Sequence, residues 1–94
     1  MIKSYRDRKT QRFAEGERVK QFEPFSRQAE KRLDLLDAAE SIQDLIAIRG
    51  NRFEALRGDR QGQFSIRIND QWRICFEWPR GSDGPENVEI VDYH

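Results

Sequence analysis

The 94-residue chain carries 17 basic and 17 acidic side chains, so its formal net charge is zero, which argues against indiscriminate nucleic-acid binding. At this length we expect one domain, residues 1–94, with no signal peptide and no membrane span, because the longest apolar run covers only residues 45–48. The single cysteine, Cys75, excludes an internal disulfide, and this predicts a protein of the reducing cytoplasm.

The first 25 residues are predicted to form short, mostly polar elements. We expect a short strand at residues 2–5 and a helix at residues 6–15, with Gly16 as its C-cap. Residues 18–25 are predicted to be irregular, because Pro24 would stop a helix there.

Two helices are predicted in the next stretch. Ser26 is a good N-cap residue, and apolar residues recur after it at helical spacing, namely Ala29, Leu33 and Leu36. Ser41 and Asp44 have the spacing of a capping box, which predicts a short helix ending at Ala47. We expect the apolar residues around it, Leu45, Ile46 and Ile48, to face inward.

Strict alternation of apolar and polar residues predicts a β-hairpin over residues 64–78. A three-residue turn at residues 69–71 makes one face continuously apolar, because it pairs Phe64 with Phe76, Ile66 with Ile74 and Ile68 with Trp72. The same register sets Arg67 opposite Arg73 on the polar face, an unfavourable pair of like charges. Either an anion lies over the two guanidinium groups, or they are solvated with carboxylates nearby.

The arginines are concentrated around this hairpin. Residues 49–73 carry six arginines and three acidic residues, and arginine is suited to bidentate contacts with phosphate. A glycine-containing linker, residues 57–62, precedes the hairpin, and a last strand is predicted at residues 87–94. Helices followed by consecutive strands predict an α+β domain, with the N-terminal helices packed on one face of an antiparallel sheet.

The polar residues suit one reaction without a metal or cofactor. One histidine and one cysteine cannot supply a conventional zinc site. RNA cleavage by the ribose hydroxyl needs an acid, a base and fixed positive charge, for which His94, Arg73 and Arg67 are candidates. Tyr93 is a candidate to stack on a base or donate a proton, and Asp92 to orient the imidazole or act as the base. The plain alternative is a structural chain end, with Tyr93 packed and His94 frayed.

The run GDRQGQFSIRIN, followed by WRICF and then DYH, resembles the HigB-type toxins of the RelE superfamily, the plasmid maintenance system killer proteins. The resemblance covers essentially the whole chain. It implies a small RelE-like fold related to microbial ribonucleases and an endoribonuclease that cuts mRNA in the A site of the small ribosomal subunit of bacteria. It also implies neutralisation by a HigA-like helix-turn-helix antitoxin, with operator DNA bound only through the antitoxin complex.

The resemblance also implies roles for individual residues. Its catalytic candidates are Arg73, Asp92, Tyr93 and His94, and Arg57 is a candidate RNA contact. The hairpin register adds Arg67 as an RNA contact, and Arg60 of the linker is a further candidate. Some family members have a histidine where this chain has Glu54, so Glu54 is a candidate acid or base. Two alternatives remain: a non-nucleolytic toxin like the ParE gyrase inhibitors, which lack the terminal DYH, and a weakened toxin that mainly binds its antitoxin.

Overall fold

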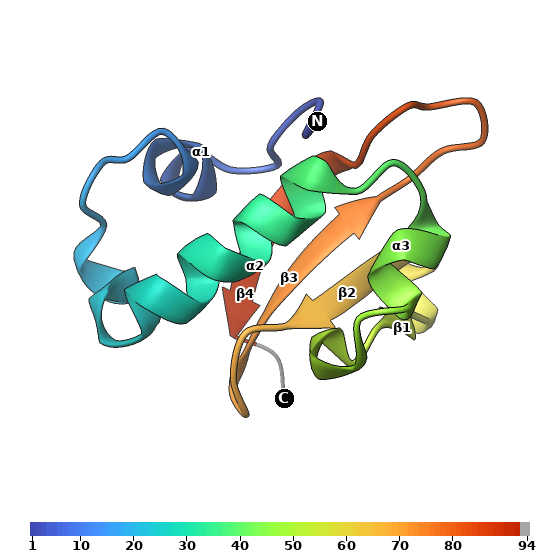
Figure 1. The fold of residues 1–94 in the computed structure, drawn as a ribbon. Helices are drawn as coiled ribbons and strands as arrows, with labels where there is room; N and C mark the ends of the chain where they lie inside the picture. Colours follow the sequence, from blue (N-terminus) through green and yellow to red (C-terminus); the bar gives the residue numbers. More distant parts are fainter. Residues whose placement is uncertain (93–94) are drawn as a thin grey trace.

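The computed structural model describes residues 1–92 and contains a four-stranded antiparallel sheet with helices on one face. The α-helices are α1 (Arg8–Ala14), α2 (Ser26–Ala38) and α3 (Ile42–Ile46), and the strands are β1 (Glu54–Ala55), β2 (Gln63–Arg67), β3 (Trp72–Glu77) and β4 (Glu86–Asp92). Strand order follows the sequence, β1-β2-β3-β4, and α2 and α3 lie across the same face of the sheet (Figure 1). The predicted α+β fold class is therefore confirmed.

The hairpin has the predicted register. Phe64 pairs with Phe76, Ile66 with Ile74, and Arg67 with Arg73. The Asn69 side chain closes the turn, because its oxygen accepts hydrogen bonds from the backbone N–H groups of Gln71 and Trp72 at 2.9 and 2.8 Å. Burial of the apolar face permits only one register, in which the aliphatic residues are paired. The same register fixes which residues are opposite each other on the polar face.

The core lies between the sheet and α2. Ile66 and Ile74 are fully buried and belong to one apolar cluster with Ala29, Leu33 and Leu36 of α2. Aromatic rings extend this cluster along the sheet: Trp72 lies 4.8 Å from Phe25 and 5.9 Å from Phe22, measured between ring centroids. The face that carries Trp72 and Ile74 is thus the helix-covered face, and the opposite one is called the open face below.

The N-terminal segment runs along β4 and covers its outer edge. The backbone N–H groups of Lys3 and Arg6 donate to the carbonyls of Pro85 and Val88 at 2.8 and 2.9 Å, and Thr10 of α1 accepts from Ile90 N–H through its hydroxyl at 3.0 Å. Only Tyr5 forms a β-bridge, with Val88, so the predicted strand at residues 2–5 is wrong. One parallel bridge, isolated backbone hydrogen bonds and the Thr10 hydroxyl satisfy this edge of β4 in place of a continuous strand pairing.

Several local predictions also need correction. Pro24 lies inside a 3₁₀ helix, Lys20–Phe25, that runs directly into α2, because its fixed φ fits such a turn. Ser26 is already helical and Phe25 occupies the N-cap position without a side-chain hydrogen bond. Ile46 is 53% exposed and does not face inward. Ser41 caps α3 as predicted, because its hydroxyl accepts from Asp44 N–H at 3.4 Å, but the Asp44 carboxylate accepts from Glu40 N–H at 2.9 Å and not from Ser41, so the capping box is only half formed.

Candidate active site

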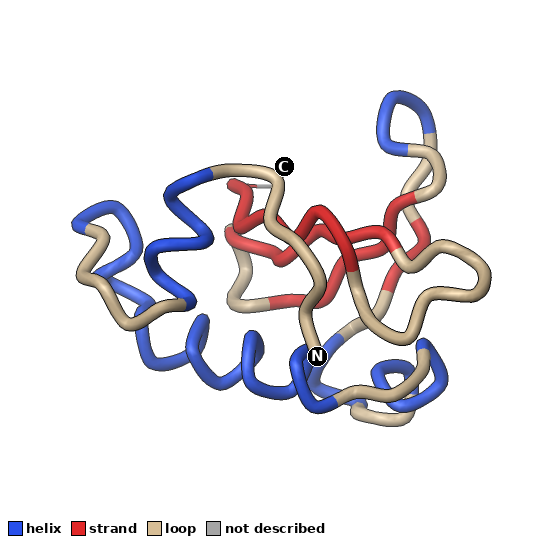
Figure 2. The backbone as a smooth tube through the Cα atoms, turned by 90° about the horizontal axis from the view of Figure 1, so that it is seen from above, coloured by secondary structure: helices blue, strands red, loops and turns tan. Residues whose placement is uncertain are grey.

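The strand register places the predicted site residues on two different faces. Paired residues point to the same side of a sheet, so Glu54, Ser65, Cys75 and Glu89 form one row across the open face, and Arg67, Arg73 and Val91 form the next. Figure 2 shows the turn Gly58–Arg60 projecting beyond the sheet on the side away from α2. The open face is therefore bounded by that turn and carries most of the predicted arginines.

Arg73 is the most firmly held of these arginines. Its Nε donates to the Ser65 hydroxyl at 2.7 Å, and one of its terminal nitrogens donates to the Arg52 carbonyl at 2.6 Å. The Arg52 carbonyl is presented by a left-handed backbone, with φ 44°. Both acceptors are neutral, and no carboxylate among residues 1–92 pairs with Arg73, so the guanidinium is fixed in place and keeps its full charge.

Arg67, the cross-strand partner of Arg73, has a carboxylate of its own. It forms an ion pair with Asp70 in the hairpin turn, and Asp70 is 97% exposed at its side chain. Solvated pairs of this kind contribute little free energy. The sequence left two interpretations of the Arg67–Arg73 pair, a bound anion or nearby carboxylates. Asp70 is such a carboxylate for Arg67, but Arg73 has none in the described chain. A competing phosphate would displace Asp70 at small cost.

Glu54 and Arg57 come together at the edge of the sheet. With Ala55 and Leu56 they line a hollow of about 380 Å³ beside β1. Both side chains are exposed, and neither takes part in a hydrogen bond or ion pair within the described part of the chain. Glu54 is paired across the strands with Ser65, which holds Arg73. The Glu54 carboxylate thus lies in the same row as the hydroxyl that holds Arg73, and Arg57 lines the hollow beside it.

Arg60 is engaged in a network over the centre of the open face. It donates to Gln63 at 3.0 Å and to Glu89 at 3.4 Å, and Glu89 also lies 3.8 Å from Arg6. This network covers Cys75, which is only 1% exposed. Burial raises the pKa of the Cys75 thiol to about 11, so the thiol is neutral at physiological pH. Arg60 therefore shares its charge with Glu89 before any ligand binds.

Asp92 lies on the helix-covered side at the end of β4. It is the cross-strand partner of Trp72, and its carboxylate accepts a hydrogen bond from the Gln71 side chain at 2.9 Å. Alternation therefore separates it from Arg73 and Arg67, which lie on the open face. The predicted residues Tyr93 and His94 lie outside the described residues, as does the end of the strand predicted at residues 87–94.

Two residues of this site were not predicted from the sequence. Ser65 and Arg52 hold Arg73, one through a hydroxyl and one through a backbone carbonyl. The register alone contains a signal for Ser65, because it places that hydroxyl one pair away from Arg73 on the same face. No sequence pattern indicates the Arg52 carbonyl, since its position depends on a left-handed residue that is not glycine.

Comparison with known proteins identifies the family. A family model described as the RelE-like toxin of the type II toxin-antitoxin system HigB matches residues 3–94. The chain belongs to this family. Toxin HigB-1 of Vibrio cholerae serotype O1 is 47% identical over 51 residues, which cover 54% of each chain, so the match spans about half of that curated relative. The predicted resemblance to HigB-type toxins of the RelE superfamily is confirmed.

A solved structure gives a weaker likeness. The YoeB/ParE toxin from Agrobacterium tumefaciens is 23% identical, with a TM-score of 0.44 over 73% of this chain and 76% of the other.

Among residues 1–92, every helix is too short or too polar to cross a lipid bilayer. No group of three or more His, Cys, Asp or Glu side chains in the same residues is arranged to hold a metal ion.

Proposed function

We propose that this HigB-family chain is a ribosome-dependent endoribonuclease of the bacterial cytoplasm, which cuts mRNA and is neutralised by a helix-turn-helix antitoxin. The observation that carries the proposal is the way in which Arg73 is held in place. A guanidinium that is held by Ser65 and by the Arg52 carbonyl, with no carboxylate partner among residues 1–92, is a preorganised site for a phosphate. Operator DNA would be bound only through the antitoxin complex.

The proposed reaction needs only side chains. The ribose 2′-hydroxyl attacks the adjacent phosphorus, the P–O5′ bond breaks, and a 2′,3′-cyclic phosphate and a free 5′-hydroxyl result. Arg73, with Arg67 opposite it, stabilises the negative charge that develops on the phosphoryl oxygens. His94 exchanges a proton near neutral pH, for which an imidazole is suited.

The remaining candidates surround this centre. Glu54 is the proposed second acid or base, because it lies beside the Ser65–Arg73 pair on the open face. Arg57 contacts the RNA backbone across the same hollow, and Arg60 contributes where RNA phosphate competes with Glu89. Tyr93 stacks on a base, and Asp92 positions the chain end through its bond with Gln71.

Primer extension on an mRNA, with and without purified ribosomes, tests this proposal. We expect extension products that stop at new 5′ ends of the mRNA only when ribosomes are present. Arg73→Ala should lower the cleavage rate by about 10²–10³-fold, as for the loss of one preorganised donor to a transition-state oxyanion, and His94→Ala by at least as much. The antitoxin should still bind both variants.

Arg27→Ala is the matched control, because Arg27 is an exposed arginine of α2, on the other layer of the molecule. It should cleave at the native rate. Intact mRNA with the native chain on translating ribosomes would refute the nuclease, and growth inhibition without cleavage would favour a ParE-like inhibitor. Native cleavage by Arg73→Ala would refute the assignment of Arg73.

A further inference from the structure

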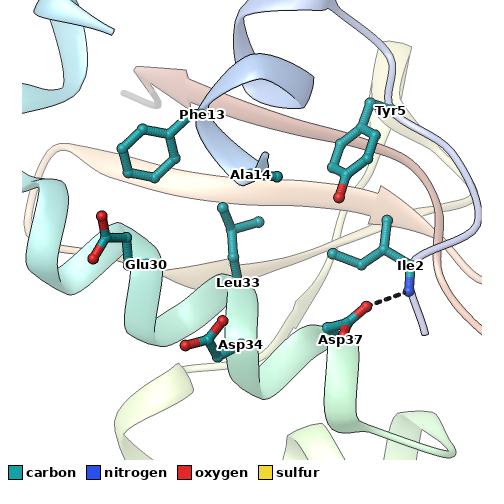
Figure 3. Close-up of a pocket in the computed structure, with 8 residues that line it drawn as sticks. All are labelled: Ile2, Tyr5, Phe13, Ala14, Glu30, Leu33, Asp34 and Asp37. Carbon is teal, nitrogen blue, oxygen red and sulfur yellow. Dashed lines mark hydrogen bonds between the residues drawn. The ribbon is translucent and has the colours of Figure 1, made fainter. Parts of the chain in front are cut away.

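A second concave site lies on the helical side of the molecule. Ile2, Tyr5, Phe13, Ala14 and Leu33 form the apolar part of a pocket of about 180 Å³ between the N-terminal segment, α1 and α2. Phe13 and Leu33 are buried at its base, and Ala14 is exposed at its mouth. Figure 3 shows Ile2, Tyr5, Phe13 and Ala14 above α2, and Leu33 with the three carboxylates on α2 itself.

The charged side chains that line this pocket are all acidic. Glu30, Asp34 and Asp37 follow one another along α2 at spacings of four and three residues, which places them on one side of the helix, and no lysine or arginine lines the pocket in the described chain. Burial and the charges of Asp37 and Glu15 raise the pKa of Tyr5 at the same site. The three carboxylates thus set a negative potential over an apolar floor.

Two of these carboxylates have no binding partner among the residues that the structure describes. Asp37 accepts a hydrogen bond from Ile2 N–H at 2.8 Å, but Glu30 and Asp34 form no hydrogen bond or ion pair with any of residues 1–92. Both are exposed, although Arg27 and Lys31 lie three residues before them on α2. Glu30 and Asp34 therefore stay unpaired within the described chain and, with Asp37, are the charged groups of α2 that line the pocket.

We infer that this acidic pocket, defined by the apolar and acidic residues above, is a docking site for a basic amphipathic segment of the antitoxin. Charge complementarity selects the occupant: an apolar side chain enters between α1 and α2, and lysine or arginine residues lie over Glu30 and Asp34. The inference rests on the proposed function for the existence of the antitoxin. RNA is excluded as the occupant, because its phosphates are repelled by the same carboxylates.

Titration calorimetry with the purified cognate antitoxin tests the inference. Asp34→Lys and, separately, Glu30→Lys should raise the dissociation constant about tenfold at low salt and by less at 0.5 M salt, since reversed charges repel a basic partner. Glu40→Lys is the matched control: an exposed acid with the same charge change whose side chain does not line the pocket. It should bind within twofold of the native chain.

Two measurements separate this inference from the proposed nuclease. Both pocket variants should melt and cleave mRNA like the native chain, since both side chains are exposed and lie on α2, away from the open face. Replacing a lysine of the antitoxin's basic segment with glutamate should restore its binding to the Asp34→Lys variant. Native affinity in both variants, or no binding of the antitoxin by the native chain, would overturn the pocket. If the two variants bind the antitoxin more weakly but the native chain cuts no mRNA, the docking site stands and only the nuclease is refuted.

Discussion

The two faces of the sheet bury their central side chains by different means. On the helix-covered face, Ile66 and Ile74 are buried under α2 and its flanking 3₁₀ helix, which contributes the ring of Phe22. On the open face, Ser65 and Cys75 are equally inaccessible, but charged side chains cover them. One strand register serves both faces. The difference teaches that apolar packing sets the register, and the register then aligns charged groups that would otherwise repel one another.

The largest effect should come from breaking the apolar face alone. Phe22→Ala removes a 2% exposed ring that contacts Phe13, Phe25 and Trp72, and it should lower the free energy of unfolding by about 3–5 kcal/mol. Urea unfolding measures the loss. The fraction that remains folded should still cleave mRNA at the native rate, and a specific loss of cleavage in fully folded protein would contradict the separation of the two faces.

A smaller effect should follow from loosening the open face. Ser65→Ala removes the acceptor of Arg73 Nε but leaves the Arg52 carbonyl in place, so we expect about a tenfold lower kcat with a nearly unchanged KM. Ser65→Thr keeps the hydroxyl and should recover most of the rate. Equal kcat values for Ser65→Ala and the native chain would show that Arg73 needs no support from Ser65.

The smallest effect concerns the thiol beneath the charged network. The folded chain holds the pKa of Cys75 at about 11, against an ordinary value of 9.0, so the unfolded thiol loses its proton first. The stability that this difference contributes is complete below pH 9 and is lost as the pH rises to about 11. Urea unfolding of the native chain and of Cys75→Ala between pH 8 and 11 measures it, since the titration of Tyr5 cancels in the difference. Parallel curves would contradict this account of Cys75.

Periodicity predicted those parts of the molecule in which one face is apolar. The hairpin register, including the opposition of Arg67 and Arg73, follows from alternation because a shift of one residue would expose every apolar side chain. The entry into α2 does not follow, since Ser26 is a favourable N-cap whose place Phe25 takes when the preceding 3₁₀ helix continues through Pro24. Burial of Phe22 and Phe25 in the core sets the path of the chain here, and α2 therefore begins without a side-chain N-cap.

The candidate site was predictable in its residue types but not in its internal contacts. Alternation placed Arg67 and Arg73 on the open face, and it also implies that Asp92, opposite Trp72, lies on the other side. Whether an arginine meets a carboxylate, a hydroxyl or a carbonyl depends on tertiary contacts that no local pattern encodes. Arg60 with Glu89 and Arg73 with the Arg52 carbonyl are of this kind, joining residues 29 and 21 positions apart.

The N-terminal segment that lies along β4 has a consequence for the synthesis of this chain. Asn87 N–H donates to the Ser4 hydroxyl at 2.9 Å, a contact between residues 83 positions apart, whereas the β2–β3 hairpin closes over a handful of residues. Closing so long a loop is slow compared with forming a hairpin, and it cannot begin until β4 has been translated. The hairpin can therefore form before the N-terminal segment covers the outer edge of β4, and the sealing of that edge comes last.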